Sequence, residues 1–210
     1  KPVGISSYDV IRRIKKYSKN KFKIGHAGTL DPFAEGVLLV CTGKMLKTID
    51  RFVDLPKTYI ADIMLHKETD TLDCTGKIIK SCNERKTISE KNIKKILNIF
   101  TTDYKQSPPC YSAKKIKGKK LYEFARKDIF IRLKAVNVKI YNIQLLNYDK
   151  NNISILVSCS PGTYIRSLAK DIGLKLGTYG YLDKLIRVQI GNFDNKNSIS
   201  MEDVKHVFNA

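Results

Sequence analysis

Apolar residues recur with helical spacing in several separate parts of the chain. This spacing predicts four helices, over residues 8–17, 46–53, 90–100 and 165–172. Ser6 and Asp9 stand three residues apart at the start of the first, as in a capping box, and Ser89 is placed to cap the third. Gly177 follows the fourth as a C-cap residue.

Other segments alternate apolar and polar residues, which is typical of half-buried strands. The predicted strands span residues 37–41, 59–65, 136–140 and 153–159. Strands and helices mix without a regular βαβ rhythm, so we expect an α+β fold with a largely antiparallel mixed sheet flanked by helices. No repeat or long linker divides the chain, and we interpret residues 1–210 as one domain.

Charge adds a first indication of function. The 39 Lys and Arg against 20 Asp and Glu give a formal net charge of +19, which favours a polyanionic partner such as nucleic acid. A genome rich in A and T, which enriches Lys, Asn and Ile together, is an alternative source of part of this excess. The five cysteines are odd in number and never spaced as C-x-x-C, so disulfide and zinc scaffolds are poorly supported.

The same features suggest a compartment. Free cysteines point to reducing surroundings, and no apolar run approaches the roughly 18 residues of a membrane span. We therefore expect a soluble cytoplasmic protein, or an organellar one if the source is eukaryotic, with no membrane partner.

Basic residues gather in one segment, Lys114–Lys134, where nine Lys and Arg accompany three aromatic residues. Basic side chains contact phosphates and aromatic rings stack on bases, so an insertion over about 103–135 is predicted to clamp RNA or DNA. A solvated amphipathic helix is the alternative. The candidate RNA-binding residues of this segment are Lys114, Lys115, Lys117, Lys119, Lys120 and Arg126.

A turn-rich stretch carries a single carboxylate, Asp31, before the predicted strand 37–41. Glycines at 25 and 28 allow a tight turn, and Pro32 restricts the backbone of Asp31, so this side chain is held in place. An aspartate before proline is commonly only a turn former. The stretch lacks the lysine of a phosphate-binding loop, which disfavours a nucleotide hydrolase.

The whole stretch G-H-A-G-T-L-D-P-F-A-E-G-V-L is similar to the signature motif of the TruB-type tRNA pseudouridine synthases. Further matching segments occur in the family's order, and the resemblance covers most of the chain. These segments are K-P-V-G-I-S-S from Lys1, K-T-Y from Lys57, T-D-T-L-D from Thr69, P-P-C-Y-S-A from Pro108, G-K-K-L-Y-E from Gly118 and G-T-Y-I-R-S from Gly162.

The chain also departs from the family pattern. Ile186 stands between Leu185 and Arg187 where the family has a first arginine, which puts one RNA contact in doubt. The chain begins within the first family motif and ends at Ala210, where the family commonly continues into a small RNA-binding domain of the PUA type. We therefore expect a truncated N-terminus and the absence of that domain.

The resemblance implies isomerisation of uridine to pseudouridine in the T arm of tRNA, at position 55, with extrusion of the target base. It implies that Asp31 is the nucleophile or base at the sugar, that Arg166 is its ion-pair partner, and that Tyr59 stacks on the base and is a candidate for the C5 proton. From the sequence pattern alone, Tyr59 would be an ordinary buried residue of a sheet, and Arg166 would be an ordinary solvated arginine.

Other family residues imply contacts with the substrate. His26 corresponds to the residue that helps displace the flipped uridine, Tyr164 and Leu185 to residues that line the uracil pocket, and Arg187 to an RNA contact. Ordinary turn and core roles are the alternatives. The reaction requires no redox cofactor or metal, and we interpret the stretch Asp70–Asp73 as structural rather than calcium-binding. The chain is expected to act as a monomer.

Two further functions stay open. A tRNA-binding or tRNA-folding protein without chemistry would explain the charge, although it would not need Asp31, Tyr59 and Arg166 together. A guide-RNA-dependent pseudouridine synthase is the second, and the F-A-E-G that follows Pro32 looks more like the stand-alone bacterial or organellar enzymes.

Overall fold

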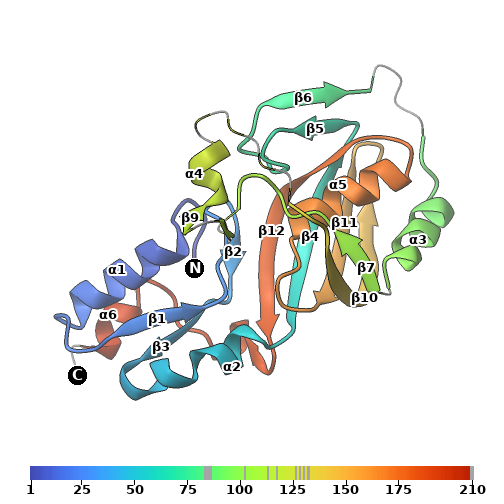
Figure 1. Ribbon diagram of the computed structural model, residues 1–210. Helices are drawn as coiled ribbons and strands as arrows, with labels where there is room; N and C mark the ends of the chain where they lie inside the picture. The colour runs from blue at the N-terminus through green and yellow to red at the C-terminus, as the bar shows by residue number, and fades with distance from the viewer. Residues whose placement is uncertain are drawn as a thin grey trace. The chain divides into compact units, whose positions relative to one another are not determined.

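The computed structural model describes all of residues 1–210 except 83–86, 102, 113, 117, 126, 128, 130, 132, 209 and 210. Helices and strands mix along the chain (Figure 1). Six of the strand pairs with a known register are antiparallel, and one, between β2 (Glu35–Gly36) and β12 (Gly180–Ile190), is parallel. The predicted α+β class is therefore confirmed. No helix among the described residues is long and apolar enough to cross a membrane.

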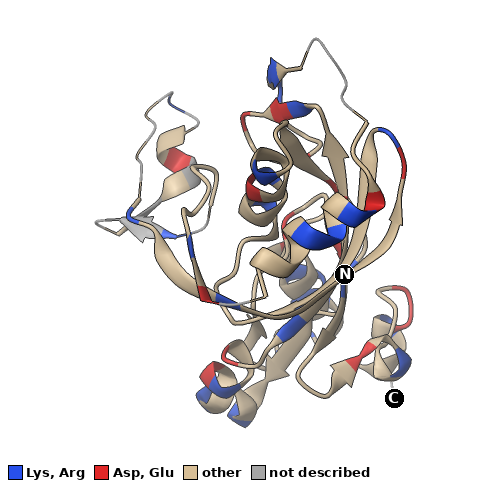
Figure 2. Cartoon of the chain, turned by 90° about the vertical axis from the view of Figure 1, so that its right-hand side faces the viewer, with Lys and Arg blue, Asp and Glu red and all other residues tan. Residues whose placement is uncertain are grey.

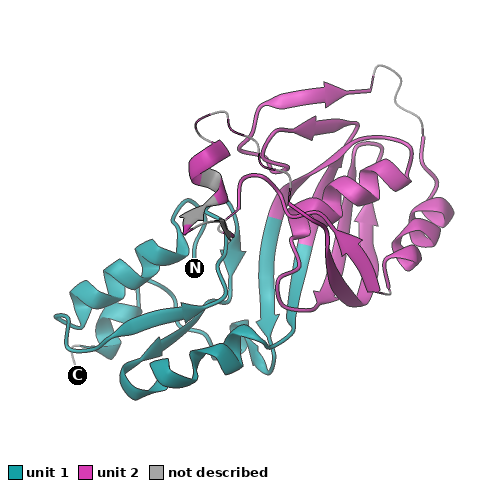
Figure 3. Ribbon diagram, viewed as in Figure 1, with its two compact units in different colours: residues 1–60, 185–210 teal, residues 61–184 magenta. Residues whose placement is uncertain are grey.

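The chain divides into two compact units, residues 1–60 with 185–210 and residues 61–184 (Figure 3). Strands β4 (Lys57–Leu65) and β12 (Gly180–Ile190) contribute residues to both. The division therefore falls within strands and not in a linker.

Unit 1 contains short elements around a small core. In chain order they are α1 (Ser7–Tyr17), β1 (Ile24–Ala27), β2 (Glu35–Gly36), β3 (Leu39–Thr42), the 3-10 helix η1 (Gly43–Thr48), α2 (Ile49–Val53), β13 (Phe193–Asp194), the 3-10 helix η2 (Asn195–Asn197) and α6 (Val204–Val207). β1 pairs with β3, and both β13 and β2 pair with β12. The predicted strand 37–41 thus appears as β3, shifted by one to two residues.

Helix α1 forms as its sequence predicts. The Ser6 side chain accepts a hydrogen bond from Asp9 N while the Asp9 carboxylate accepts from Ser6 N, so the capping box is complete. Apolar residues on one face of the helix pack into a core with β1 and α6, namely Val10, Ile11 and Ile14 with Ile24 and Val204. The opposite face of α1 is left to solvent.

Unit 2 is built on strands in the order β12-β4-β11-β10-β7. Its further elements are β5 (Lys67–Thr69), β6 (Ile78–Ser81), α3 (Glu90–Ile99), β7 (Asp103–Gln106), β8 (Lys115–Ile116), β9 (Lys119–Lys120), α4 (Leu121–Ala125), β10 (Val136–Tyr148), β11 (Asn152–Cys159) and α5 (Ile165–Lys175). Odd-numbered residues of β4 and β11 are buried in strict alternation, as their sequence pattern predicts.

Helices α3 and α5 supply the rest of the core of unit 2. Ile93 and Leu97 of α3 and Leu168, Ala169 and Ile172 of α5 are all buried. The hairpin β5–β6 differs, because all four residues of β6 are exposed and β6 pairs only with β5 among the described strands. Ile78 is 56% and Ile79 55% exposed.

Candidate active site

The turn that carries Asp31 is fixed by hydrogen bonds to every backbone carbonyl from Gly28 to Pro32. The donors are Arg187 for Gly28 and Thr29, the Ser7 hydroxyl for Leu30, the Ala34 amide for Asp31, and the Gly4 amide with the Lys1 ammonium for Pro32. Ser7 Oγ also accepts from Leu30 N at 2.8 Å. Because these partners come from α1, the N-terminal segment and β12, Asp31 stands on a rigid turn.

Glycine is required in this turn at position 28. Its φ of +92° is one that other residues rarely adopt, and a Cβ there would lie 3.6 Å from both Arg187 Nη1 and Lys57 Cε. Lys57 is itself buried at the start of β4, with Nζ donating to the carbonyl oxygens of Leu55 (2.7 Å) and Val53. Two cationic side chains therefore pack against the backbone just before Asp31.

Arg187 is 1% exposed, and the partners of its guanidinium among the described residues all belong to unit 1. It donates to three backbone carbonyls, those of Gly28 (3.0 Å), Thr29 (3.5 Å) and Val37 (2.8 Å). Buried carbonyls need such donors, and a guanidinium with five N–H groups can serve several at once. These contacts hold the Arg187 guanidinium against the protein backbone, and the expectation that Arg187 contacts RNA stays a prediction.

Gly36 holds β2 close to β12. Gly36 has a φ of +109°, pairs with Arg187 in parallel, and a Cβ on it would lie 2.2 Å from the Arg187 carbonyl oxygen. The Val37 amide donates to that same oxygen at 2.8 Å. The F-A-E-G part of the signature motif thus ends in a glycine that close strand packing demands.

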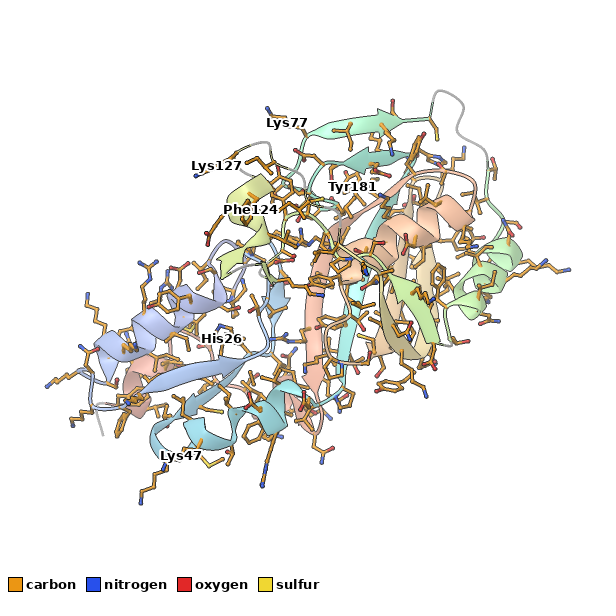
Figure 4. All side chains as sticks on the ribbon, viewed as in Figure 1. His26, Lys47, Lys77, Phe124, Lys127 and Tyr181 are labelled. Atoms are coloured by element: carbon orange, nitrogen blue, oxygen red, sulfur yellow. The ribbon has the colours of Figure 1, made fainter. Side chains whose placement is uncertain are left out.

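Charge around the turn is favourable to an anion. Burial lowers the pKa of Lys1 to about 8, while the nearby carboxylates of Asp31 and Glu35 oppose this by favouring its charged form. His26, labelled in Figure 4, lies on β1 one residue before the buried Ala27. Burial, and then Arg187, lower the pKa of His26, so its ring is neutral at pH 7.

Unit 1 also holds Tyr59 and Leu185. Both are buried, Tyr59 on the inward-facing side of β4 and Leu185 on β12. Unit 1 therefore contains five of the predicted site residues: His26, Asp31, Tyr59, Leu185 and Arg187.

Arg166 and Tyr164 belong to unit 2, at the start of α5. The Arg166 side chain is buried, which rules out the solvated alternative. Its Nη1 donates to the Thr71 carbonyl (2.9 Å) and to the Asp73 carboxylate (3.3 Å), and its Nη2 donates to the Tyr111 carbonyl (2.8 Å). Tyr164 is held by its backbone, whose N–H and C=O both bond the side chain of the fully buried Gln106.

Asp73 is the anchor of Arg166 in unit 2. Its Oδ1 accepts from the Thr71 hydroxyl and from both the amide and hydroxyl of Thr75, which leaves Oδ2 for Arg166. The loop leaves no room at Gly76, where a Cβ would lie 2.3 Å from Thr71 Oγ1. The structural interpretation of this stretch agrees with these contacts, although no sequence pattern indicated its link to Arg166.

The basic insertion contains a hairpin and a short helix. Strand β8 pairs with β9 so that Lys115 stands directly opposite Lys120, and α4 follows at once. Lys114 is exposed, Lys117 and Arg126 lie outside the described residues, and the side chains of Lys115, Lys119 and Lys120 are not described.

The rest of the insertion presents both charge and aromatic surface. Phe124 on α4 is half-buried and Lys127 just after it is exposed; both are labelled in Figure 4. Lysine and arginine also lie on helices, strands and loops elsewhere in the chain (Figure 2). The excess of positive charge therefore extends beyond this insertion.

The structure places Asp31 on a fixed turn of a basic α+β fold, as the sequence resemblance implies. Comparison with protein families supports the same resemblance. Residues 13–165 match the TruB family pseudouridylate synthase N-terminal domain, and residues 166–210 match the tRNA pseudouridylate synthase B C-terminal domain. The chain belongs to the TruB family of pseudouridylate synthases.

Curated relatives match most of its length. The chain is 45% identical over 204 residues to tRNA pseudouridine synthase B of Clostridium acetobutylicum, covering 97% of this chain and 70% of the relative. It is 46% identical over 193 residues to that of Fusobacterium nucleatum, covering 92% and 66%.

Solved structures share the fold at lower identity. A Cbf5-Nop10-Gar1 complex contains a chain with a TM-score of 0.75 and 28% identity, of which 52% is covered, as is 98% of the present chain. An H/ACA RNP bound to a substrate RNA contains another, with a TM-score of 0.71, 26% identity and coverages of 98% and 50%. The present chain spans about half the length of these solved chains.

Proposed function

We propose that the chain isomerises uridine to pseudouridine in tRNA, at position 55 of the T arm. Support for the reaction comes from the family match and from relatives named tRNA pseudouridine synthase B. The observation within the structure that carries the proposal is the Asp31 turn, in which every carbonyl from Gly28 to Pro32 is engaged.

Rigidity of this turn matters to the chemistry. The carboxylate must meet the ribose of an extruded nucleotide in one orientation, and a pre-organised group reacts without a further cost of ordering. In the proposed reaction Asp31 acts at the sugar, the C1′–N1 bond breaks, the base turns, C5 bonds to C1′, and the C5 proton is removed.

Neighbouring residues have supporting roles in this proposal. Tyr59 stacks on the target base and is the candidate for the C5 proton, and neutral His26 helps to displace the base from the RNA stack. Tyr164 and Leu185 line the uracil pocket. Arg166, whose other donors are fixed by Asp73, Thr71 and Tyr111, is the ion-pair partner of Asp31 that the family resemblance implies.

The lysines of the insertion complete the proposal by binding RNA phosphates. Such contacts offset the few kcal/mol needed to unstack and extrude the uridine. The chain is 45% identical to tRNA pseudouridine synthase B of Clostridium acetobutylicum but only 28% identical to the chain in the Cbf5-Nop10-Gar1 complex. We propose that it acts as a monomer without a guide RNA.

Asp31→Asn tests the central role. The amide keeps the size of the side chain but cannot act as a nucleophile or base, so pseudouridine formation is expected to disappear while tRNA affinity stays within several-fold. Pseudouridine is mapped in a tRNA transcript after incubation, and binding is measured in parallel. Turnover at one tenth of the wild-type rate or more would exclude Asp31 as the reacting group.

A further inference from the structure

A second basic surface lies outside the insertion, at the end of α1. Residues 12–23 contain seven Lys and Arg and no acidic residue, which is a denser charge than in the insertion. Six of these side chains are exposed, and we name them the α1 basic surface: Arg12, Arg13, Lys16, Lys19, Lys21 and Lys23. All belong to unit 1, whereas the insertion belongs to unit 2.

The helix confines this charge to one side. Val10, Ile11 and Ile14 of α1 face the core, which leaves the basic residues on the solvent side. Arg12 pairs with Asp9, but both groups reach solvent and such a pair contributes little. Lys19, Lys21 and Lys23 have no acidic partner within 4 Å among the described residues, so the surface keeps a net positive charge.

The loop after α1 holds its lysines in defined places. Lys19 and Asn20 have φ of 49° and 58°, a left-handed conformation that costs energy in residues other than glycine. Backbone hydrogen bonds fix the loop, from Asn20 N to Lys15 O (2.9 Å), from Lys21 N to Ser18 O (3.0 Å) and from Gly43 N to Lys23 O (2.9 Å). Lys21 and Lys23 flank Phe22, whose side chain is 43% exposed.

Cations on a fixed backbone beside an exposed aromatic ring match the phosphates and bases of RNA. The short strand β1, Ile24–Ala27, separates this loop from the turn of Asp31. At about 3.3 Å per residue, its four residues span about 13 Å, several times the roughly 3.4 Å that one nucleotide of a strand occupies. The loop therefore lies several nucleotide lengths of an RNA strand away from the turn of Asp31.

We propose that the α1 basic surface binds the phosphate backbone of tRNA in the helical part outside the T loop. This inference rests on the proposed function, because it takes the reacting RNA to be tRNA. It assigns the surface to affinity and positioning of the whole tRNA and gives it no part in the chemical step.

A triple variant tests the proposal: Lys19→Asn, Lys21→Gln and Lys23→Gln, with asparagine chosen because it tolerates the left-handed conformation. The matched control is Lys91→Gln, Lys94→Gln and Lys95→Gln, which removes three charges from the exposed face of α3. Thermal melting of both variants checks that they fold.

For a full-length tRNA transcript, the triple variant is expected to bind at least tenfold more weakly at about 0.1 M salt. The slope of log affinity against log salt is expected to fall by about 0.9 for each phosphate that the variant no longer neutralises. The value of kcat at saturating tRNA stays unchanged, and the control variant behaves as the wild type.

Three outcomes would overturn the inference: an unchanged affinity and slope, an equal loss in the α3 control, or an equal loss with a T-loop hairpin whose stem is shortened. Failure of the proposed function is seen separately. It would appear as a wild-type protein that binds tRNA but forms no pseudouridine, whereas failure of this inference leaves the wild-type reaction intact.

Discussion

The substitution Arg187→Met distinguishes two possible roles of this buried arginine. Either its side chain binds RNA, or it acts as a brace that stabilises the Asp31 turn through hydrogen bonds to backbone carbonyls. The guanidinium makes two short hydrogen bonds, to Val37 O (2.8 Å) and Gly28 O (3.0 Å). Hydrogen bonds from charged donors contribute about 1.5–3 kcal/mol each, and the methionine leaves both carbonyls without a donor. We expect the free energy of unfolding to fall by about 3–6 kcal/mol.

That loss is a large share of the roughly 5–15 kcal/mol that stabilises a typical protein, so Arg187→Met is expected to unfold at much lower urea. Arg187→Lys keeps the charge but lacks the planar fork, and should recover only part of the stability. Urea unfolding followed by circular dichroism measures the difference. The control is Lys184→Met, an exposed residue of the same strand, with an expected change within about 0.5 kcal/mol.

A specific result would refute this reasoning. If Arg187→Met unfolded at the same urea concentration as the wild type but bound tRNA tenfold more weakly, the side chain would be an RNA ligand despite its burial. Reduced stability with normal tRNA affinity of the folded fraction, measured at low temperature, would instead support the brace.

The remaining predictions concern three other positions. Asp73→Asn removes the charge that anchors Arg166, so single-turnover rates should fall at least tenfold while the tRNA Kd changes less than threefold; a normal rate would contradict this. Gly36→Ala, whose Cβ would meet backbone at 2.2 Å, should lower stability by about 3 kcal/mol or more, seen as a reduced Tm. Burial raises the pKa of Asp171 to about 6, so wild-type stability falls as pH rises from 4 through 6. At a pH above 7, Asp171→Asn should therefore stabilise the protein by about 1–3 kcal/mol and so raise its Tm. At pH 4 the same substitution should have no effect on the Tm.

Local sequence patterns correctly predicted the helices and strands that depend on contacts between residues close in the sequence. Helix α1 formed with its Ser6 capping box, and β4 and β11 kept their alternation, because capping and core-facing periodicity depend only on neighbouring residues. Strand β12 was missed, because Asp183 and Lys184 are both exposed and shift the phase of its alternation.

The candidate active site could not be predicted from the spacing of residues along the sequence alone. Sequence spacing alone favoured a plain turn at Asp31, and only the long family motif indicated a catalyst. Arg187 and Asp73 could not be placed, since their partners lie far away in the chain: Arg187 bonds Gly28, and Asp73 bonds Arg166. A buried charge is recognised only when the carbonyls or ions that satisfy it are known.

The exposed hairpin β5–β6 has a consequence for self-association. Among the described strands β6 pairs only with β5, so its other edge presents backbone groups beside two exposed isoleucines, Ile78 and Ile79. This combination can template pairing between copies. Lys77 and Lys80 flank them and repel a second copy, although Glu68 neutralises part of the charge of Lys80. At 1 M salt, where screening shortens the reach of charge to about 3 Å, this repulsion is lost. High-salt buffers that strip RNA from such a basic protein therefore also remove its protection against edge-to-edge aggregation.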